Sequence, residues 1–146
     1  MSEEAQLVIM LRNNATGFLE KEYAAISLAE LGELEPLLVN VFAAQEGGVT
    51  YIHMKLSTVG DVSDWQYNAI YDYYDDEVFA GAVTSVNELD DVFNPTWELV
   101  FESPSVEKGA EKLASKVNDL LKLHSSELAD TLEAISDKER EYINEQ

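Results

Sequence analysis

The chain has no cysteine among its 146 residues and only nine lysines and arginines. Without cysteine it can form neither a disulfide nor a thiolate metal site, which agrees with a reducing compartment. No apolar run is as long as a membrane span, and the N-terminal sequence MSEEAQLVIM is acidic where a signal peptide would be basic. We therefore expect a cytoplasmic protein with no membrane association, in the host cytoplasm if the chain is viral.

Basic residues are missing altogether from the middle of the chain. Residues 56–107 contain no lysine or arginine but twelve Asp and Glu, and the whole chain has a formal net charge of -20. Such a density of one sign costs self-repulsion in the folded state and attracts a cationic partner. It also argues against direct binding of nucleic acid, because no basic stripe is present to release counterions.

The chain also lacks the motifs from which most active sites are built. Its two histidines, His53 and His124, are far apart in the sequence, and no HExxH, GxSxG or P-loop motif is present. The acidic runs do not have the ligand spacing of an EF-hand. We therefore expect no enzyme, no cofactor and no metal site.

What the chain does contain is enough apolar material to fold. Hydrophobic residues make up 46% of it, too many for a disordered acidic tail, and its length suits one domain with one core. We predict a single acidic α+β domain over residues 1–146, strand-rich in 1–103 and helical in 104–146.

Alternating apolar residues predict an antiparallel sheet of about five to seven strands within residues 5–102. In one predicted hairpin, Leu37, Val39 and Val41 share a face, and the returning strand places His53 opposite Ile52 and Met54. The turns and the later strands are predicted at Asn13–Gly17, Glu46–Gly48, Val78–Val86 and Thr96–Glu102.

The segment Trp65–Tyr74 fits two patterns. Its alternating aromatic residues fit a strand, whereas Ser63 or Asp64 can cap a helix that begins at Trp65. We favour the strand, because aromatic side chains suit a pleated, half-buried surface.

From residue 104 onward the apolar residues recur at helical spacing. The stripe predicts one long or two shorter amphipathic C-terminal helices packed on the sheet. His124-Ser125-Ser126-Glu127 is either a break between two helices or an exposed turn of one continuous helix. A homodimer formed through this helix is the alternative use of the stripe.

The richest local feature is the segment of residues 64–79, which holds six of the 14 aromatic residues and five acids without a base. Tyrosines beside carboxylates are good anchors for lysine and arginine side chains of a partner. The candidate partner-binding residues come from this segment and from the next acidic run: Asp72, Tyr73, Tyr74, Asp75, Asp76, Glu77, Glu88, Asp90 and Asp91.

Dense carboxylates can occupy a basic groove that is built for DNA phosphates. In size, acidity and lack of catalytic motifs, the chain is similar to phage-encoded inhibitors of restriction and CRISPR enzymes that act as nucleic-acid mimics. This similarity implies a non-enzymatic inhibitor whose partner is a protein with a basic nucleic-acid-binding groove. The alternatives are a cytosolic interaction or assembly protein and a chain whose acidity is an adaptation to salt.

Overall fold

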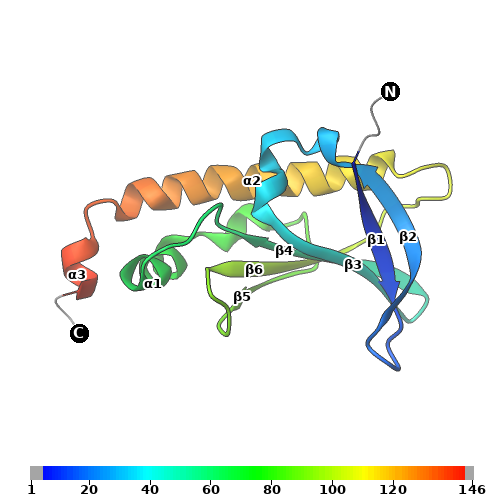
Figure 1. The fold of residues 1–146 in the computed structure, drawn as a ribbon, viewed down its shortest axis with the longest axis horizontal. Coiled ribbons are helices and arrows are strands. Elements are labelled where there is room, and N and C mark those ends of the chain that lie inside the picture. Colours follow the sequence, from blue (N-terminus) through cyan, green and yellow to red (C-terminus); the bar gives the residue numbers. More distant parts are fainter. Residues whose placement is uncertain (1–4, 144–146) are drawn as a thin grey trace.

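The computed structural model describes residues 5–143 as a six-stranded sheet with a long helix across one face (Figure 1). The ends of the predicted domain, residues 1–4 and 144–146, lie outside the described residues. The strands are β1 (Gln6–Arg12), β2 (Leu19–Ser27), β3 (Leu38–Glu46), β4 (Val49–Ser57), β5 (Ser85–Leu89) and β6 (Thr96–Glu102). The helices are α1 (Asp64–Tyr73), α2 (Glu111–Ile135) and α3 (Glu139–Ile143), with the short 3₁₀ turns η1 (Leu28–Glu30), η2 (Gly32–Leu37) and η3 (Asp76–Phe79). The predicted α+β class is confirmed.

The strands are arranged in the order β2-β1-β3-β4-β6-β5. Every neighbouring pair is antiparallel except β1 and β3, which are parallel over the short stretch Met10–Arg12. The chain leaves β2 at the end where β1 begins and enters β3 there, so β3 must run in the direction of β1. The sheet is therefore mostly, not wholly, antiparallel.

The predicted turn between β3 and β4 is confirmed, because Gly47 and Gly48 have φ values of 58° and 82°, which other residues adopt only with strain. The shared face predicted for Leu37, Val39 and Val41 is wrong. Leu37 ends η2, and the register of β3 shifts between Leu38 and Asn40. This irregularity leaves Val39 exposed while Val41 is buried.

Trp65–Tyr73 lies in a helix, so the strand that we favoured is wrong. A capping box begins α1, in which the side chain of Gln66 accepts a hydrogen bond from the backbone N–H of Ser63 at 2.9 Å. Ala69 and Ile70 are then buried against the core. The capping pair was visible in the sequence, and it outweighs the preference of aromatic residues for strands.

The strand predicted at Val78–Val86 is also wrong, because most of this segment forms η3 and the loop that follows it. The carboxylate of Asp75 accepts a hydrogen bond from the backbone N–H of Glu77 at 3.0 Å and starts the turn. Gly81 then has a φ of 78°, which breaks an extended path. The strand β5 begins only at Ser85.

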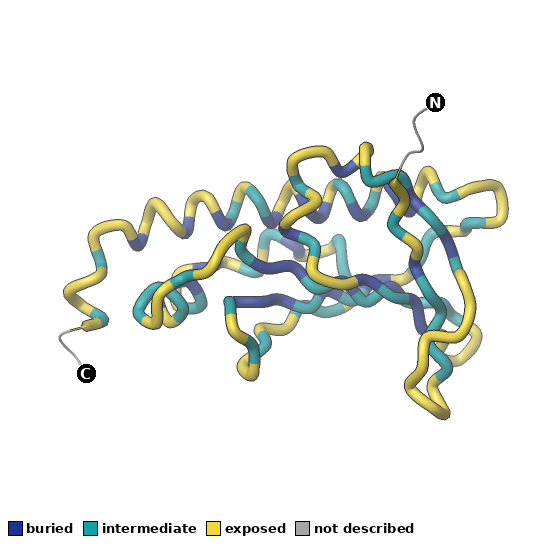
Figure 2. The backbone as a smooth tube through the Cα atoms, in the orientation of Figure 1, coloured by how far each residue is buried: buried dark blue, intermediate teal, exposed yellow. Residues whose placement is uncertain are grey.

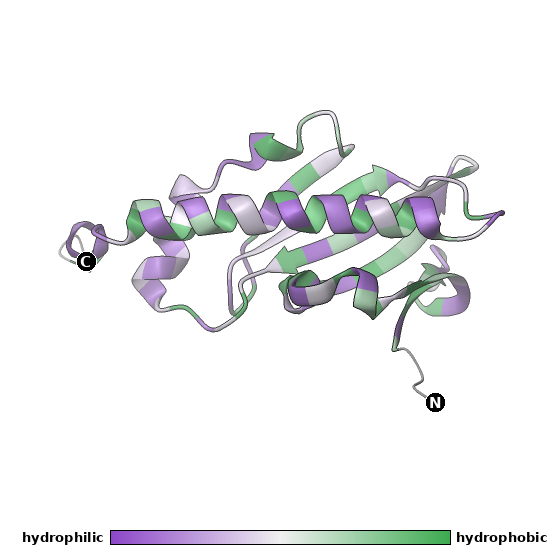
Figure 3. Ribbon diagram, turned by 90° about the horizontal axis from the view of Figure 1, so that it is seen from above, coloured by the Kyte–Doolittle hydropathy of each residue, from purple (hydrophilic) through white to green (hydrophobic). Residues whose placement is uncertain are grey.

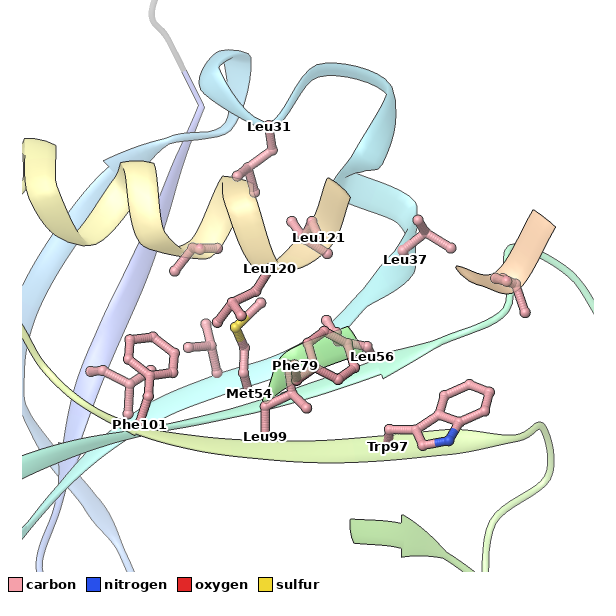
Figure 4. Packing of buried hydrophobic residues seen from close by; sticks show 14 of the residues in the cluster. Leu31, Leu37, Met54, Leu56, Phe79, Trp97, Leu99, Phe101, Leu120 and Leu121 are labelled. Atoms are coloured by element: carbon pink, nitrogen blue, oxygen red, sulfur yellow. The ribbon is translucent and has the colours of Figure 1, made fainter. Parts of the chain in front are cut away.

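The helix α2 is continuous through His124, and its apolar stripe packs on the sheet. The buried residues follow one side of the helix (Figure 2), and hydrophobic and hydrophilic residues alternate along its length (Figure 3). Leu120 points from α2 onto Met54 and Leu99 of the sheet (Figure 4). The prediction that the stripe covers the sheet is confirmed.

Among the described residues, no helix covers the opposite face of the sheet (Figure 1). His53 lies there, as predicted, with its ring stacked on Phe42 at 4.8 Å between centroids. The guanidinium carbon of Arg12 lies 4.8 Å from the centre of the Phe42 ring. This face therefore combines aromatic and charged side chains that are only partly buried.

Within residues 5–143, no helix has the length and apolar character needed to cross a membrane.

Candidate partner-binding surface

The segments that carry the candidate residues meet where β5 is joined to β6. Tyr71 of α1 fixes this arrangement, because its hydroxyl donates to the carbonyl of Leu89 and accepts from the N–H of Thr96 at 2.9 Å. Tyr67, one turn earlier, donates to the carbonyl of Asp90 at 3.3 Å. Two tyrosines on one side of α1 thus attach the helix to the β5–β6 hairpin, and burial raises the pKa of Tyr71 to about 12.

This arrangement brings together carboxylates that are distant in the sequence. Burial raises the pKa of Glu88 on β5, and the charges of Asp76 and Asp72 raise it further. The three groups therefore lie close enough to repel one another. We call the group Asp72, Asp75, Asp76, Glu77 and Glu88 the acidic surface.

Within the described residues, no basic side chain forms an ion pair with the acidic surface. Over residues 5–143, the ion pair at contact distance joins Lys138 to Asp137 at 3.9 Å and includes none of these carboxylates. The segment 56–107 supplies no lysine or arginine that could compensate. The repulsion among these carboxylates is therefore not relieved by any ion pair within residues 5–143.

The members of the acidic surface differ in what else they do. Asp75 caps η3, and Asp72 accepts a hydrogen bond from the Tyr142 hydroxyl at 2.7 Å, which ties α3 to α1. In the described part of the chain, no hydrogen bond engages the side chains of Asp76, Glu77 or Glu88. The carboxylates of Asp76, Glu77 and Glu88 therefore form no hydrogen bond that stabilises the described part of the fold.

Tyr74 does not lie on the surface. It is 7% exposed, its ring stacks on Trp97 at 4.2 Å, and its hydroxyl bonds to Nδ1 of His124 at 2.9 Å. The reason is helical spacing, because Tyr74 follows the buried Ile70 by four residues. We therefore withdraw Tyr74 from the candidate residues, whereas Tyr73 is 41% exposed beside Asp72 and stays among them.

His124 is buried, so the exposed turn that we considered at this position is wrong. Its Nε2 lies 2.8 Å from the carbonyl of Ser57 and must carry the proton there, which leaves Nδ1 to accept from Tyr74. Burial lowers the pKa of His124 to about 4. The histidine is a neutral core residue that joins α2 to β4 and to the end of α1.

Asp90 and Asp91 lie in the exposed β5–β6 loop, next to the β4–α1 loop. Asn94 joins the two loops, since its amide donates to the carboxylate of Asp61 at 3.1 Å and its side-chain oxygen accepts from the N–H of Val62 at 3.2 Å. Phe93 at the tip is 79% exposed. Sequence reasoning missed Phe93, although a phenylalanine between an acidic run and Asn-Pro was the available signal.

Among the described residues, no group of three or more His, Asp or Glu side chains is placed to hold a metal ion.

The chain belongs to a family of unknown function, DUF6762, whose model matches residues 1–143. No curated protein and no solved structure matches it. What the chain does must therefore follow from the chemistry of its own residues.

Proposed function

We propose that this chain is a non-enzymatic binding protein whose acidic surface blocks the basic nucleic-acid-binding groove of a partner protein. One observation supports this proposal above the others. The carboxylates of Asp76, Glu77 and Glu88 are gathered beside β5, and no basic side chain of residues 5–143 is paired with them.

The physical argument is the relief of repulsion. Double-stranded DNA presents one charge per about 1.7 Å of its axis, and a groove that binds it holds a matching array of lysines and arginines. Carboxylates that crowd one another without internal partners gain most when such an array approaches. Tyr73 adds an exposed aromatic ring beside Asp72, and such a ring accepts a cation on its face. Binding of this kind weakens as salt rises, because exposed charges are screened.

Charge reversal at the acidic surface should weaken partner binding more than tenfold. The test variant changes Asp76, Glu77 and Glu88 to lysine. The control changes three exposed residues to lysine, namely Glu22 on the edge strand β2 and Glu30 and Glu33 in the turns η1 and η2 that follow it. Both variants change the net charge equally, so long-range attraction is matched and the difference reports local contact.

The partner for this test is found with a panel of purified restriction and CRISPR nucleases. Fluorescence anisotropy of a labelled DNA duplex measures how much of each nuclease's DNA binding the chain abolishes, at several salt concentrations. Equal losses of partner binding in both triple variants would mean that the acidity acts through the net charge and not through local contact. A nuclease that bound the chain and DNA at the same time would exclude mimicry.

The second candidate function is assembly of copies of this chain, now through the uncovered face of the sheet. The stripe of α2 is buried within one chain, so it does not favour a dimer through that helix. The uncovered face instead presents Phe42 and His53 beside Arg12, with Glu98 close enough to raise the pKa of His53 against the larger lowering by burial. If assembly is the function, analytical ultracentrifugation should find a dimer that Phe42→Glu dissociates.

A further inference from the structure

We propose that the free edge of β5 accepts an extended basic segment of the partner as a seventh strand, and that an apolar side chain of that segment fills the cavity beside β5. This inference rests on the proposed function, because it names the part of the partner that the acidic surface binds. It depends on two further features, the edge of the end strand β5 and the cavity beside it.

The edge is the first element of the argument. Within residues 5–143 the sheet ends at β5, which pairs with β6 on one side and with no described strand on the other (Figure 1). An end strand presents backbone N–H and C=O groups outward on alternate residues, and an added strand can pair with them. Asn87 and Glu88 in the middle of this strand are exposed.

The cavity is the second element. Its volume is about 250 Å³, and it is lined by Asp76, Glu77, Phe79, Ala80, Val83, Thr84, Ser85 and Val86. A cavity of about 150 Å³ accepts a benzene ring, so this one has room for a leucine or phenylalanine side chain. Because Ser85 and Val86 begin β5, a strand laid along β5 passes the cavity.

The walls of the cavity are held in place from two sides. The ammonium of Lys116 on α2 donates to the carbonyl of Ala82 at 2.5 Å and lies 5.6 Å from the centre of the Phe101 ring. The opposite wall is η3, which Asp75 caps and which buries Phe79 in the core. A preformed cavity loses little conformational entropy when it is filled, which favours binding.

Charge decides which strand can be added. Asp76 and Glu77 line the cavity, and Glu88 lies on β5 itself. A second copy of this chain paired along β5 would bring a second acidic surface against the first, and like charges on neighbouring strands destabilise the pair. A segment rich in lysine or arginine would instead neutralise a group whose pKa is already raised by its acidic neighbours. The occupant is therefore a basic segment of another protein.

The alternation of β5 adds a sequence requirement. Val86 and Glu88 are two residues apart and lie on one face of the sheet, opposite Leu99 and Trp97 of β6. A strand added beside β5 must place its apolar residue next to Val86 and a basic residue two positions away, next to Glu88. The expected motif is an apolar residue and a lysine or arginine separated by one residue.

The test uses a fluorescent peptide of the sequence Lys-Thr-Leu-Thr-Lys-Thr-Lys with both ends blocked. Two control peptides keep its charge: one is N-methylated at alternate residues, and one has glycine in place of leucine. We expect anisotropy at low salt to show at least tenfold weaker binding of each control. Hydrogen exchange of the Ser85–Leu89 amides should slow when the parent peptide binds and not when the N-methylated one is added.

On the protein side, Glu77→Lys at the cavity should weaken binding of the parent peptide at least tenfold. Glu133→Lys is the matched control, because Glu133 is exposed on α2 and lies outside this cavity. Circular dichroism of both variants confirms that they are folded. Equal binding of the parent peptide to both variants would contradict the assignment of the site.

The outcomes separate this inference from the proposed function. Equal binding of the parent and N-methylated peptides, or no binding of either, would exclude strand addition. The charge-reversal test on the nucleases would still decide whether the acidic surface blocks a nucleic-acid-binding groove. If that test fails while the parent peptide slows exchange in β5, the edge site stands and the mimic is wrong.

Discussion

Val117→Asp should unfold the domain. Val117 is fully buried where α2 packs on the sheet, so the aspartate would be cut off from solvent. An unpaired charge in a core costs several kcal/mol, which is on the order of the whole stability of a domain, about 5–15 kcal/mol. Far-ultraviolet circular dichroism should show loss of structure, and size-exclusion chromatography should show an expanded chain.

Leu123→Asp is the control for this experiment. It introduces the same charge on the same helix, but Leu123 is 37% exposed, so the carboxylate can reach water. We expect its free energy of unfolding to change by about 1 kcal/mol or less. A Val117→Asp chain that stayed folded would show that the stripe of α2 does not form the core.

His124 should make the stability of the fold depend on pH between about pH 6.5 and pH 4. Burial lowers its pKa in the folded state to about 4 from an ordinary value of 6.5. Over this range the imidazole of His124 is protonated in the unfolded chain but neutral in the folded chain, so the free energy of unfolding falls as the pH falls. The stability is complete above pH 6.5, and the loss is complete below pH 4. It amounts to about 3 kcal/mol, since each unit of pKa corresponds to about 1.4 kcal/mol.

His124→Gln is the matched variant, because a glutamine amide can still donate to the Ser57 carbonyl that Nε2 of His124 contacts at 2.8 Å, and it does not titrate. Protonation of the many carboxylates also changes stability with pH, but it does so in both proteins and cancels in their difference. Urea unfolding at pH 7, 6, 5 and 4 should show the wild type losing about 3 kcal/mol relative to the variant. Parallel curves would mean that the folded state takes up the proton freely and that His124 is not held neutral.

Three parts of the fold followed from local patterns in the sequence. The alternation in Thr96–Glu102 and the apolar stripe of α2 each repeat a geometric period. The Gly47–Gly48 turn was recognisable because glycine adopts positive φ without strain. The shortage of lysine and arginine likewise marked residues 56–107 as acidic before any contact was known.

The residues that form the candidate surface depended on contacts between distant segments. Tyr67 and Tyr71 dock α1 on the β5–β6 hairpin, and these contacts bring Asp72 and Asp76 near Glu88. In the sequence, Tyr74 stands beside acidic residues and His124 stands beside two serines, so both look like surface residues. Each can be buried because the other satisfies its hydrogen bond.

The amino-acid sequence by itself determined the class of fold, the amphipathic helix and the sign of the charge, because periodicity and composition are properties of neighbouring residues. Only the tertiary structure decided that Trp65–Tyr73 is helical, that β5 is an end strand and that a cavity opens beside it. Strand order, the burial of a polar pair and the crowding of carboxylates arise from pairings across the chain. Those pairings are selected by the free energy of the whole core, which no local pattern records.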